Sequence, residues 1–146
     1  MCLIIDSCVA HRAVNMADPD FAPVRDSLSA GEQVLVIGGQ LLREYKKYRE
    51  IVRFVVELDR RGRARIVRDE RVDAETQRIT DSGLCGSNDQ HLVALARVTG
   101  ARLLCTSDGA AAHDFTRKEL LDHPRGKVYQ KSAHRHLLRG GCFGCL

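Results

Sequence analysis

The sequence has no tryptophan, and aromatic residues make up only 5% of its 146 residues. This scarcity argues against a module that binds single-stranded nucleic acid mainly by stacking bases on aromatic side chains. No apolar run approaches the length of about 20 residues that a membrane-spanning helix needs. The apolar run 2–5 ends at Asp6, which is too short for a secretory signal. We therefore expect a soluble, cytoplasmic chain with no membrane partner.

Several nucleotide and phosphate motifs are also missing. No Gly-rich turn ends in Lys-Ser or Lys-Thr, which excludes a P-loop. The first apolar run is not followed by the glycine pattern of a dinucleotide site. A phosphatase of the haloacid dehalogenase type would carry an acid two residues after Asp6, where this chain has Cys8.

Six cysteines are present, and three of them lie in or beside apolar or turn segments, where we expect reduced thiols: Cys8, Cys85 and Cys105. Cys142 and Cys145 have the spacing of a zinc or redox pair, but a second Cys-x-x-Cys is absent. His134 and His136 could complete a set of four ligands. The alternative is that 140–146 is only a short Gly/Cys tail after a single domain spanning 1–139.

Charge is distributed unevenly around a net value of +4. Segment 43–68 has ten basic and four acidic residues, and segment 116–146 has seven basic and two acidic ones. Segment 69–115 has eight acidic and four basic residues, and 1–42 has a net charge of −3. Basic flanks beside acidic segments suit a polyanion held next to a carboxylate cluster that needs metal. Solvated helix faces would produce the same pattern.

Apolar runs and turn residues predict alternating strands and helices. Strands are predicted at 2–5, 33–37, 64–67, 102–106 and 127–129. Helices are predicted at 21–28, 40–58, from the Ser87 or Asn88 cap to Gly100, and at 132–138. Another helix is predicted to start at 109, with 117–121 continuing helical. Segment 7–15 is a helix or a turn, and 72–79 is a helix or a loop. This alternation predicts an α/β fold with a mainly parallel sheet and helices on both faces.

Four carboxylates occupy matched places in this pattern. Asp6 and Asp108 each follow a strand, Asp89 lies in the first turn of a helix, and Glu44 lies in the second turn of another. Unscreened by a cation, such acids would repel by about 1 kcal/mol per pair even in water at 4 Å. Oxygen-only ligands suit Mg²⁺ or Mn²⁺, which can activate water for phosphodiester hydrolysis. Taken singly, Asp89 and Asp108 are as readily explained as helix caps, and Glu44 as a surface charge.

Four sequence segments together resemble the PIN domain family, and among its members the bacterial and archaeal PIN proteins, including the VapC-type toxins: LIIDSCV, GGQLLREY, SNDQHLVALA, and LLCTSD followed by HDF. The resemblance implies a three-layer α/β/α sandwich and a Mg²⁺- or Mn²⁺-dependent endoribonuclease. Asp6, Glu44, Asp89 and Asp108 match the acidic quartet of that family, as catalytic residues and metal ligands. The resemblance further implies RNA as substrate, a homodimer, and a cognate antitoxin if the chain is a toxin rather than a related defence or RNA-processing nuclease.

Further residues near these segments are candidates for the same site. Asp114 is either an additional metal ligand or a surface residue. Ser7 follows Asp6, and Ser107 precedes Asp108. Each serine could orient its neighbouring acid or bind a phosphate. Basic residues early in the predicted helix 40–58 are candidates for holding the RNA backbone: Arg43, Lys46 and Lys47. The alternative to an enzyme is a catalytically weak PIN module that binds RNA or protein.

Overall fold

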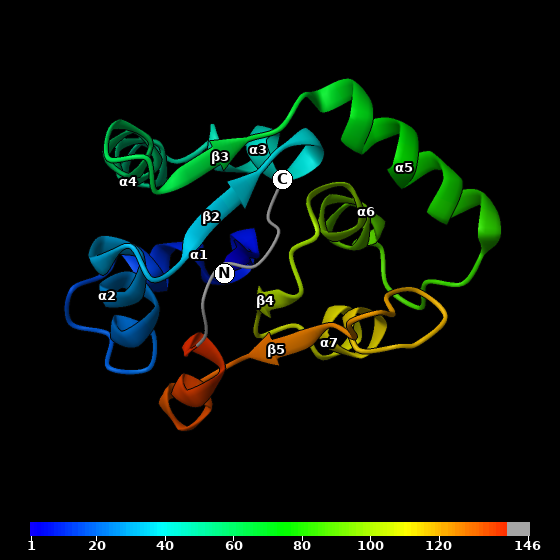
Figure 1. Cartoon of the computed structure of the whole chain (residues 1–146). Helices are drawn as coiled ribbons and strands as arrows, with labels where there is room; N and C mark the ends of the chain where they lie inside the picture. The colour runs from blue at the N-terminus through cyan, green and yellow to red at the C-terminus, as the bar shows by residue number, and fades with distance from the viewer. Residues whose placement is uncertain (140–146) are drawn as a thin grey trace.

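The computed structural model describes residues 1–139, which form one five-stranded, all-parallel sheet (Figure 1). Its strand order is β3-β2-β1-β4-β5. The strands are β1 (Cys2–Ile5), β2 (Val34–Ile37), β3 (Ala64–Ile66), β4 (Leu103–Cys105) and β5 (Lys127–Tyr129). All five lie within the segments from which strands were predicted. The side chains of β1 and β4 are buried on both faces, as expected for covered parallel strands, whereas the edge strands β3 and β5 are only partly buried.

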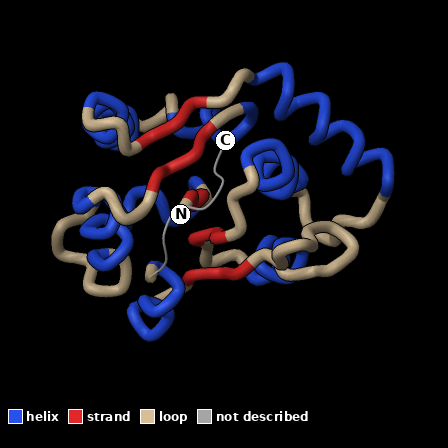
Figure 2. The backbone as a smooth tube through the Cα atoms, in the orientation of Figure 1, coloured by secondary structure: helices blue, strands red, loops and turns tan. Residues whose placement is uncertain are grey.

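Helices cover both faces of the sheet, so the three-layer α/β/α fold class predicted from the sequence is confirmed. Their bounds are α1 (Ser7–Val14), α2 (Ala22–Ala30), α3 (Gly39–Tyr45), α4 (Arg49–Arg60), α5 (Asp69–Ser82), α6 (Gln90–Thr99) and α7 (Gly109–Phe115), with a 3₁₀ helix η1 (Ser132–Leu138). In Figures 1 and 2, α1, α2 and α4 lie on one side of the sheet and α5, α6 and α7 on the other. Helix α3 packs against α5 and α6.

The strand order reverses between β1 and β4. The chain moves outward from β1 through β2 to β3, then returns through α5 and α6 to place β4 on the other side of β1. Leu3, Ile4 and Ile5 pair with Leu103, Leu104 and Cys105, and all six side chains are buried. Parallel open sheets bind ligands at such a switch point, outside the carboxyl ends of the strands.

The predicted long helix 40–58 is wrong, because the chain forms two helices, α3 and α4. They are separated at Tyr48, whose backbone is extended at φ −125° and ψ 114°. Helix α3 buries Leu41 and Tyr45, whereas α4 buries Ile51, Val55 and Leu58. Tyr48 and Val52, which one continuous helix would place near the apolar face of Leu41 and Tyr45, are instead exposed, with 52% and 38% of their surface accessible.

Two other predicted segments also differ. Residues 117–121 do not continue α7, which ends at Phe115, because Leu120 and Leu121 bury in a turn and the Leu120 carbonyl accepts a bond from Arg97. Segment 72–79 is a helix and not a loop, as part of α5. The predicted helix 132–138 is present as the 3₁₀ helix η1. Cys142 and Cys145 lie outside the described residues.

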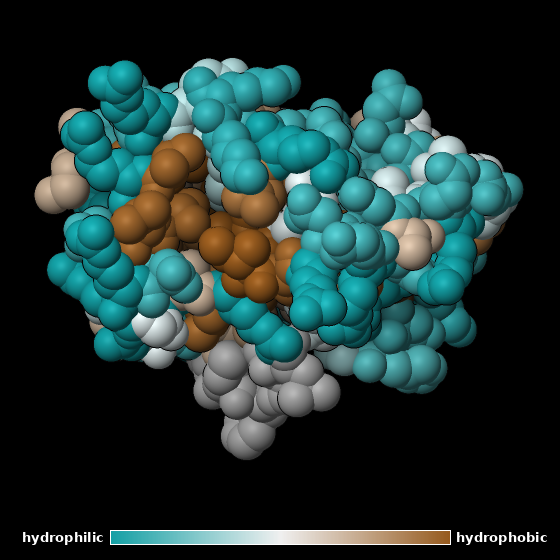
Figure 3. Space-filling model, turned by 90° about the horizontal axis from the view of Figure 1, so that it is seen from above, coloured by the Kyte–Doolittle hydropathy of each residue, from teal (hydrophilic) through white to brown (hydrophobic). Residues whose placement is uncertain are grey.

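Apolar side chains reach the surface on α4 and on the edge strand β3. Val52, Val56 and Ile66 have exposed fractions of 38%, 41% and 52%. Figure 3 shows apolar surface on the half of the molecule that holds these two elements. Among the described residues, no helix is both long and apolar enough to cross a membrane.

Candidate functional site at the carboxyl ends of β1 and β4

Asp6 and Asp108 meet at the switch point through Thr106. The buried Thr106 hydroxyl donates to Asp6 Oδ2 at 2.8 Å, and it accepts from the backbone N–H of Asp108 at 3.0 Å. The backbone N–H of Asp6 donates to the Cys105 carbonyl at 2.9 Å. One carboxylate oxygen of Asp108 caps α7 by accepting from the N–H groups of Ala110 and Ala111. The interpretation of Asp108 as a helix cap is thus correct, and the second oxygen of its carboxylate takes no part in the cap.

Glu44 reaches the same end of the sheet from α3. The neighbouring Tyr45 is buried, and its hydroxyl donates to the Ile5 carbonyl, which fixes α3 against the end of β1. Ser7 Oγ lies 3.4 Å from Glu44 Oε2, and His91 Nε2 lies 3.4 Å from the same oxygen. Ser7 therefore contacts Glu44 and not its neighbour Asp6.

Asp89 is the residue that precedes α6, and not a member of its first turn as predicted. Its carboxylate makes no capping hydrogen bond, so the simple cap interpretation fails for this residue. The turn is held instead by Ser87, whose hydroxyl accepts from the Asp89 N–H at 3.2 Å. Burial raises the pKa of Asp89, and the nearby carboxylates of Asp6, Asp108 and Glu44 raise it further, with His91 acting in the opposite direction. The charges of Asp6, Asp108 and Glu44 therefore act on Asp89.

Asp114 is buried, with 1% of its surface exposed, so its interpretation as a surface residue is wrong. Its carboxylate accepts from the N–H groups of Gly86 and Ser87, each at 2.9 Å, and from the Ser87 hydroxyl at 2.5 Å. Burial alone would raise the pKa of Asp114, but these hydrogen bonds and the charge of Arg117 outweigh it and lower the pKa. Asp114 thus orders the turn before Asp89, and a metal-ligand role stays a prediction that competes with these bonds.

A cavity of about 450 Å³ opens beside Glu44 and Asp89, between α3, α5 and the start of α6. Arg43 lines it, but its guanidinium is bound to Asp73 at 2.9 Å and lies 3.8 Å from Asp69. The role of Arg43 in substrate binding stays a prediction.

The other predicted substrate-binding residues lie around the same end of the sheet. Lys46 and Lys47 are exposed in the turn after α3. Ser107 is exposed, with its hydroxyl 3.6 Å from the Cys8 thiol. These positions are compatible with contact to a polyanion and do not test it.

The charges at this site are poorly compensated. Within residues 1–139, no lysine or arginine forms an ion pair with any of the four acids, and His91 beside Glu44 is the nearest basic group. Carboxylate oxygens without cationic partners fit a hard divalent cation in donor type and charge. In their present arrangement, however, no three Asp, Glu, His or Cys side chains of the described residues form a group that could hold a metal ion.

Three residues at the site were not predicted from the sequence. Thr106 links Asp6 to Asp108, His91 faces Glu44, and the Cys8 thiol lies 3.3 Å from Asp6 Oδ2. His91 Nε2 is buried without a hydrogen-bond partner. In the sequence, Cys8 lies two residues after Asp6 and His91 lies two residues after Asp89, and this spacing could have identified both as residues of the site. Cys8 is free, as are Cys85 and Cys105, which confirms the prediction for these thiols.

Comparisons with known proteins leave the family open. No family model matches the chain, and no curated protein matches it. Among solved structures, it is similar to a chain of VapBC2 from Rickettsia felis, crystallised bound to a DNA fragment from the promoter. That similarity has 17% sequence identity and a TM-score of 0.45, and it covers 74% of this chain and 89% of the other. A similarity this low indicates no function, so any function must be inferred from the residues of the site.

Proposed function

We propose that this chain is a nuclease that hydrolyses RNA internally and depends on Mg²⁺ or Mn²⁺. The observation that carries the proposal is the convergence of four carboxylates at the β1/β4 switch point, none of them paired with a lysine or arginine of residues 1–139. Burial raises the pKa of Asp89 there, and the charges of Asp6, Asp108 and Glu44 raise it further. Natural sequences tolerate such repulsion mainly where function requires it. The PIN resemblance of the same segments supports this assignment.

Each acid has a separate support in the fold. Thr106 orients Asp6, the start of α7 orients Asp108, Tyr45 anchors the helix that carries Glu44, and Ser87 shapes the turn at Asp89. A divalent cation, when bound, would neutralise these acids and polarise the phosphodiester for attack by water. Asp6, Glu44, Asp89 and Asp108 are the residues that would hold it.

RNA would approach across the exposed basic turn after α3. Lys46 and Lys47 lie there, beyond the cavity that Glu44 and Asp89 line. Cationic side chains beside an acidic centre hold the phosphate backbone without reading its sequence.

A binding module without catalysis is the second candidate. The observation that favours it is that the described residues form no group of three metal-holding side chains. Calorimetric titration with Mn²⁺ separates the two candidates, because a nuclease of this type must bind the ion. Heat of binding that is lost in the Asp89→Asn variant supports the nuclease, and no binding at millimolar Mn²⁺ supports the binding module.

The direct test is cleavage of RNA by purified protein with Mn²⁺. We expect the Asp6→Asn variant to lose activity and to remain folded, because Asn keeps the size of the side chain and can still accept from Thr106. The matched control is Asp26→Asn, since the side chain of Asp26 is 74% exposed on α2. Full activity in Asp6→Asn, with EDTA-sensitive cleavage by the wild type, would remove the four acids from the mechanism.

A toxin role within this function is a narrower proposal. It requires a cognate antitoxin that inhibits the nuclease, whereas a defence or RNA-processing nuclease requires none. The neighbouring gene distinguishes these roles, because a small upstream DNA-binding protein that co-purifies with the chain and stops cleavage supports the toxin.

A further inference from the structure

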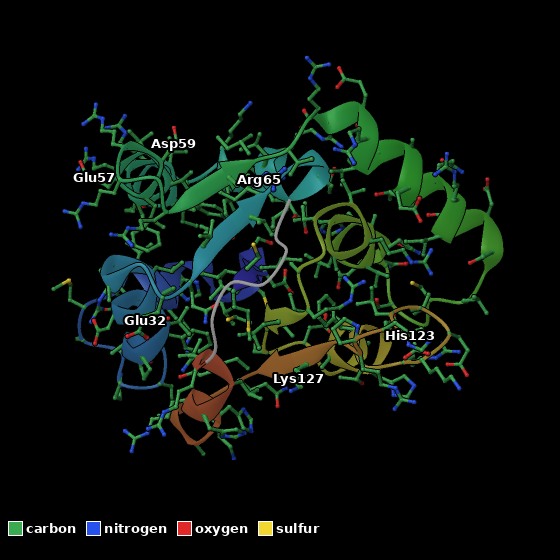
Figure 4. All side chains as sticks on the ribbon, viewed as in Figure 1. Glu32, Glu57, Asp59, Arg65, His123 and Lys127 are labelled. Atoms are coloured by element: carbon green, nitrogen blue, oxygen red, sulfur yellow. The ribbon has the colours of Figure 1, made fainter. Side chains whose placement is uncertain are left out.

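A second cavity lies at the opposite end of the sheet, where β1, β4 and β5 begin. Its volume is about 370 Å³, and five basic residues contribute to its lining: Arg102, Arg125, Lys127, His136 and Arg139. Lys127, labelled in Figure 4, is the first residue of β5. No aspartate or glutamate is among the described residues that line this basic cavity. An anion placed there would meet positive charge from three separate segments.

The basic cavity has an ordered wall. Arg102 Nε donates to the Pro124 carbonyl at 2.9 Å, and its Nη1 donates to the carbonyls of Ala96 and Ala101 at 2.7 and 2.9 Å. Its guanidinium is thus fixed by neutral acceptors, and within residues 1–139 it forms no ion pair. Burial, with a smaller contribution from Arg97, lowers the pKa of Arg102, as expected for an uncompensated cation.

The backbone is also ordered at two of the other cations, Lys127 and Arg139, whose side chains are exposed. The Lys127 N–H donates to the Arg102 carbonyl at 2.8 Å, which sets the start of β5 beside that of β4. The buried Gln33 side chain donates to the Leu138 carbonyl at 2.7 Å and fixes the chain just before Arg139. Arg125, Lys127 and Arg139 form no ion pair within the described part of the chain. Guanidinium and ammonium groups arranged in this way favour phosphate.

The remaining lining is apolar and makes the cavity larger than a phosphate requires. Met1, Leu103, Pro124 and Leu137 contribute to it. At about 30 Å³ per water, the volume corresponds to about a dozen water molecules. Small-molecule sites of this kind combine an apolar body with a few charged groups that fix orientation. The expected ligand therefore has a phosphate and an attached apolar or aromatic part.

We propose that the basic cavity binds a nucleoside 5′-phosphate, with the phosphate on Arg125, Lys127 and Arg139 and the nucleoside against Met1, Leu103 and Leu137. The ligand is either a free nucleotide or the 5′-terminal nucleotide of an RNA strand. This site is separate from the carboxylate cluster and does not depend on nuclease activity. Binding there would give the chain a second contact with nucleotides.

The test is calorimetric titration of the full chain with AMP and with inorganic phosphate, in EDTA so that the carboxylate cluster holds no metal. We expect AMP to bind more tightly than phosphate. Arg125→Gln and Lys127→Gln should each weaken AMP binding about tenfold, as expected for the loss of one charge-assisted hydrogen bond. The matched controls are Lys131→Gln and Arg135→Gln, two exposed cations that do not line the cavity. Asp6→Asn should bind AMP normally.

A 5′-phosphorylated and a 5′-hydroxyl oligonucleotide identify the source of the ligand. Tighter binding of the phosphorylated strand than of AMP assigns the RNA end, and the reverse order assigns the free nucleotide. The proposal is overturned if AMP does not bind at millimolar concentration or if phosphate binds as tightly as AMP. Equal loss of binding in Lys127→Gln and Lys131→Gln would also overturn it. Equal binding of the 5′-hydroxyl and phosphorylated strands excludes the RNA end and leaves the free nucleotide as the ligand.

Discussion

The two ends of strands β1 and β4 carry opposite chemistry, although the same strands supply both. At the carboxyl ends, Asp6 and Asp108 join Glu44 and Asp89 without a lysine or arginine partner. At the amino ends, basic residues line a cavity without an acid among its described lining residues. The two regions are separated by the length of β1, roughly 13 Å at 3.3 Å per residue. Parallel strands make this possible, because each end of the sheet collects residues from several segments.

The difference shows how each region tolerates its charge. Arg102 at the amino ends is held by three carbonyl groups, and Asp114 near the carboxyl ends is held by Gly86 and Ser87. Both are structural charges with satisfied hydrogen bonds. Asp89, in contrast, makes no capping bond, and the charges of three other acids act on it, so hydrogen bonds of this kind do not compensate its charge. Uncompensated groups are the ones expected to meet a ligand.

The largest expected effect is on catalysis at the acidic end. Glu44→Gln should reduce Mn²⁺-dependent RNA cleavage by at least about 100-fold, because the loss of even an indirect metal contact commonly costs 10- to 100-fold. Cleavage rates at saturating RNA measure it. The control is Glu50→Gln in the first turn of α4, which faces solvent. Equal activity of the two variants would show that Glu44 is not part of the site.

Next in size is the loss of the Asp114 carboxylate. Asp114→Ala should lower the free energy of unfolding by about 2–3 kcal/mol, since two backbone N–H groups and the Ser87 hydroxyl lose a charged acceptor. Urea denaturation measures the change, with Asp26→Ala as the exposed control. The turn before Asp89 should also lose order, so cleavage should fall together with stability.

The pH dependence of this effect has a defined sign. The pKa of Asp114 is lower in the folded state than in the unfolded state. Its contribution to stability is therefore fully present above the unfolded pKa and is lost as the pH falls through the folded pKa. The stability difference between wild type and Asp114→Ala should be constant near neutral pH and should shrink in acid.

A smaller effect is expected from the structural charge at the basic end. Arg102→Met should lower the free energy of unfolding by about 1–2 kcal/mol, because the carbonyls of Pro124, Ala96 and Ala101 lose a donor. Arg125→Gln, an exposed change at the same cavity, should stay within about 0.5 kcal/mol of wild type. Urea denaturation of both variants checks this ordering.

The smallest effect has the opposite sign. Asp89→Asn should stabilise the metal-free protein at neutral pH by up to about 1 kcal/mol, because it removes repulsion from Asp6, Asp108 and Glu44. The pKa of Asp89 is higher in the folded state, so ionisation of this group weakens the fold as the pH rises through that value. The gain should therefore disappear in acid. Unfolding midpoints at pH 7 and pH 4 check it, and a lower midpoint at pH 7 would contradict it.

Much of the fold was predictable because local patterns determine it. Residues 2–5 and 103–105 are apolar on both faces, which indicates covered parallel strands, and Asp6 follows the first of them directly. The division of 40–58 into α3 and α4 was not predictable in this way. Both helices have apolar stripes, and the tertiary structure places Tyr45 on the Ile5 carbonyl and leaves Tyr48 extended between the two helices.

The sequence by itself determined the strands, the placement of Asp6 and Asp108 just beyond their ends, and the uneven distribution of charge. Only the tertiary structure decided that β4 lies beside β1, so that Thr106 bonds to Asp6 one hundred residues away. It also decided that Asp114 supports a turn and that Arg102, Lys127 and Arg139 line one cavity. The physical reason is that strand order and helix docking are set by burial over the whole chain, whereas each pattern in the sequence reports only its own segment.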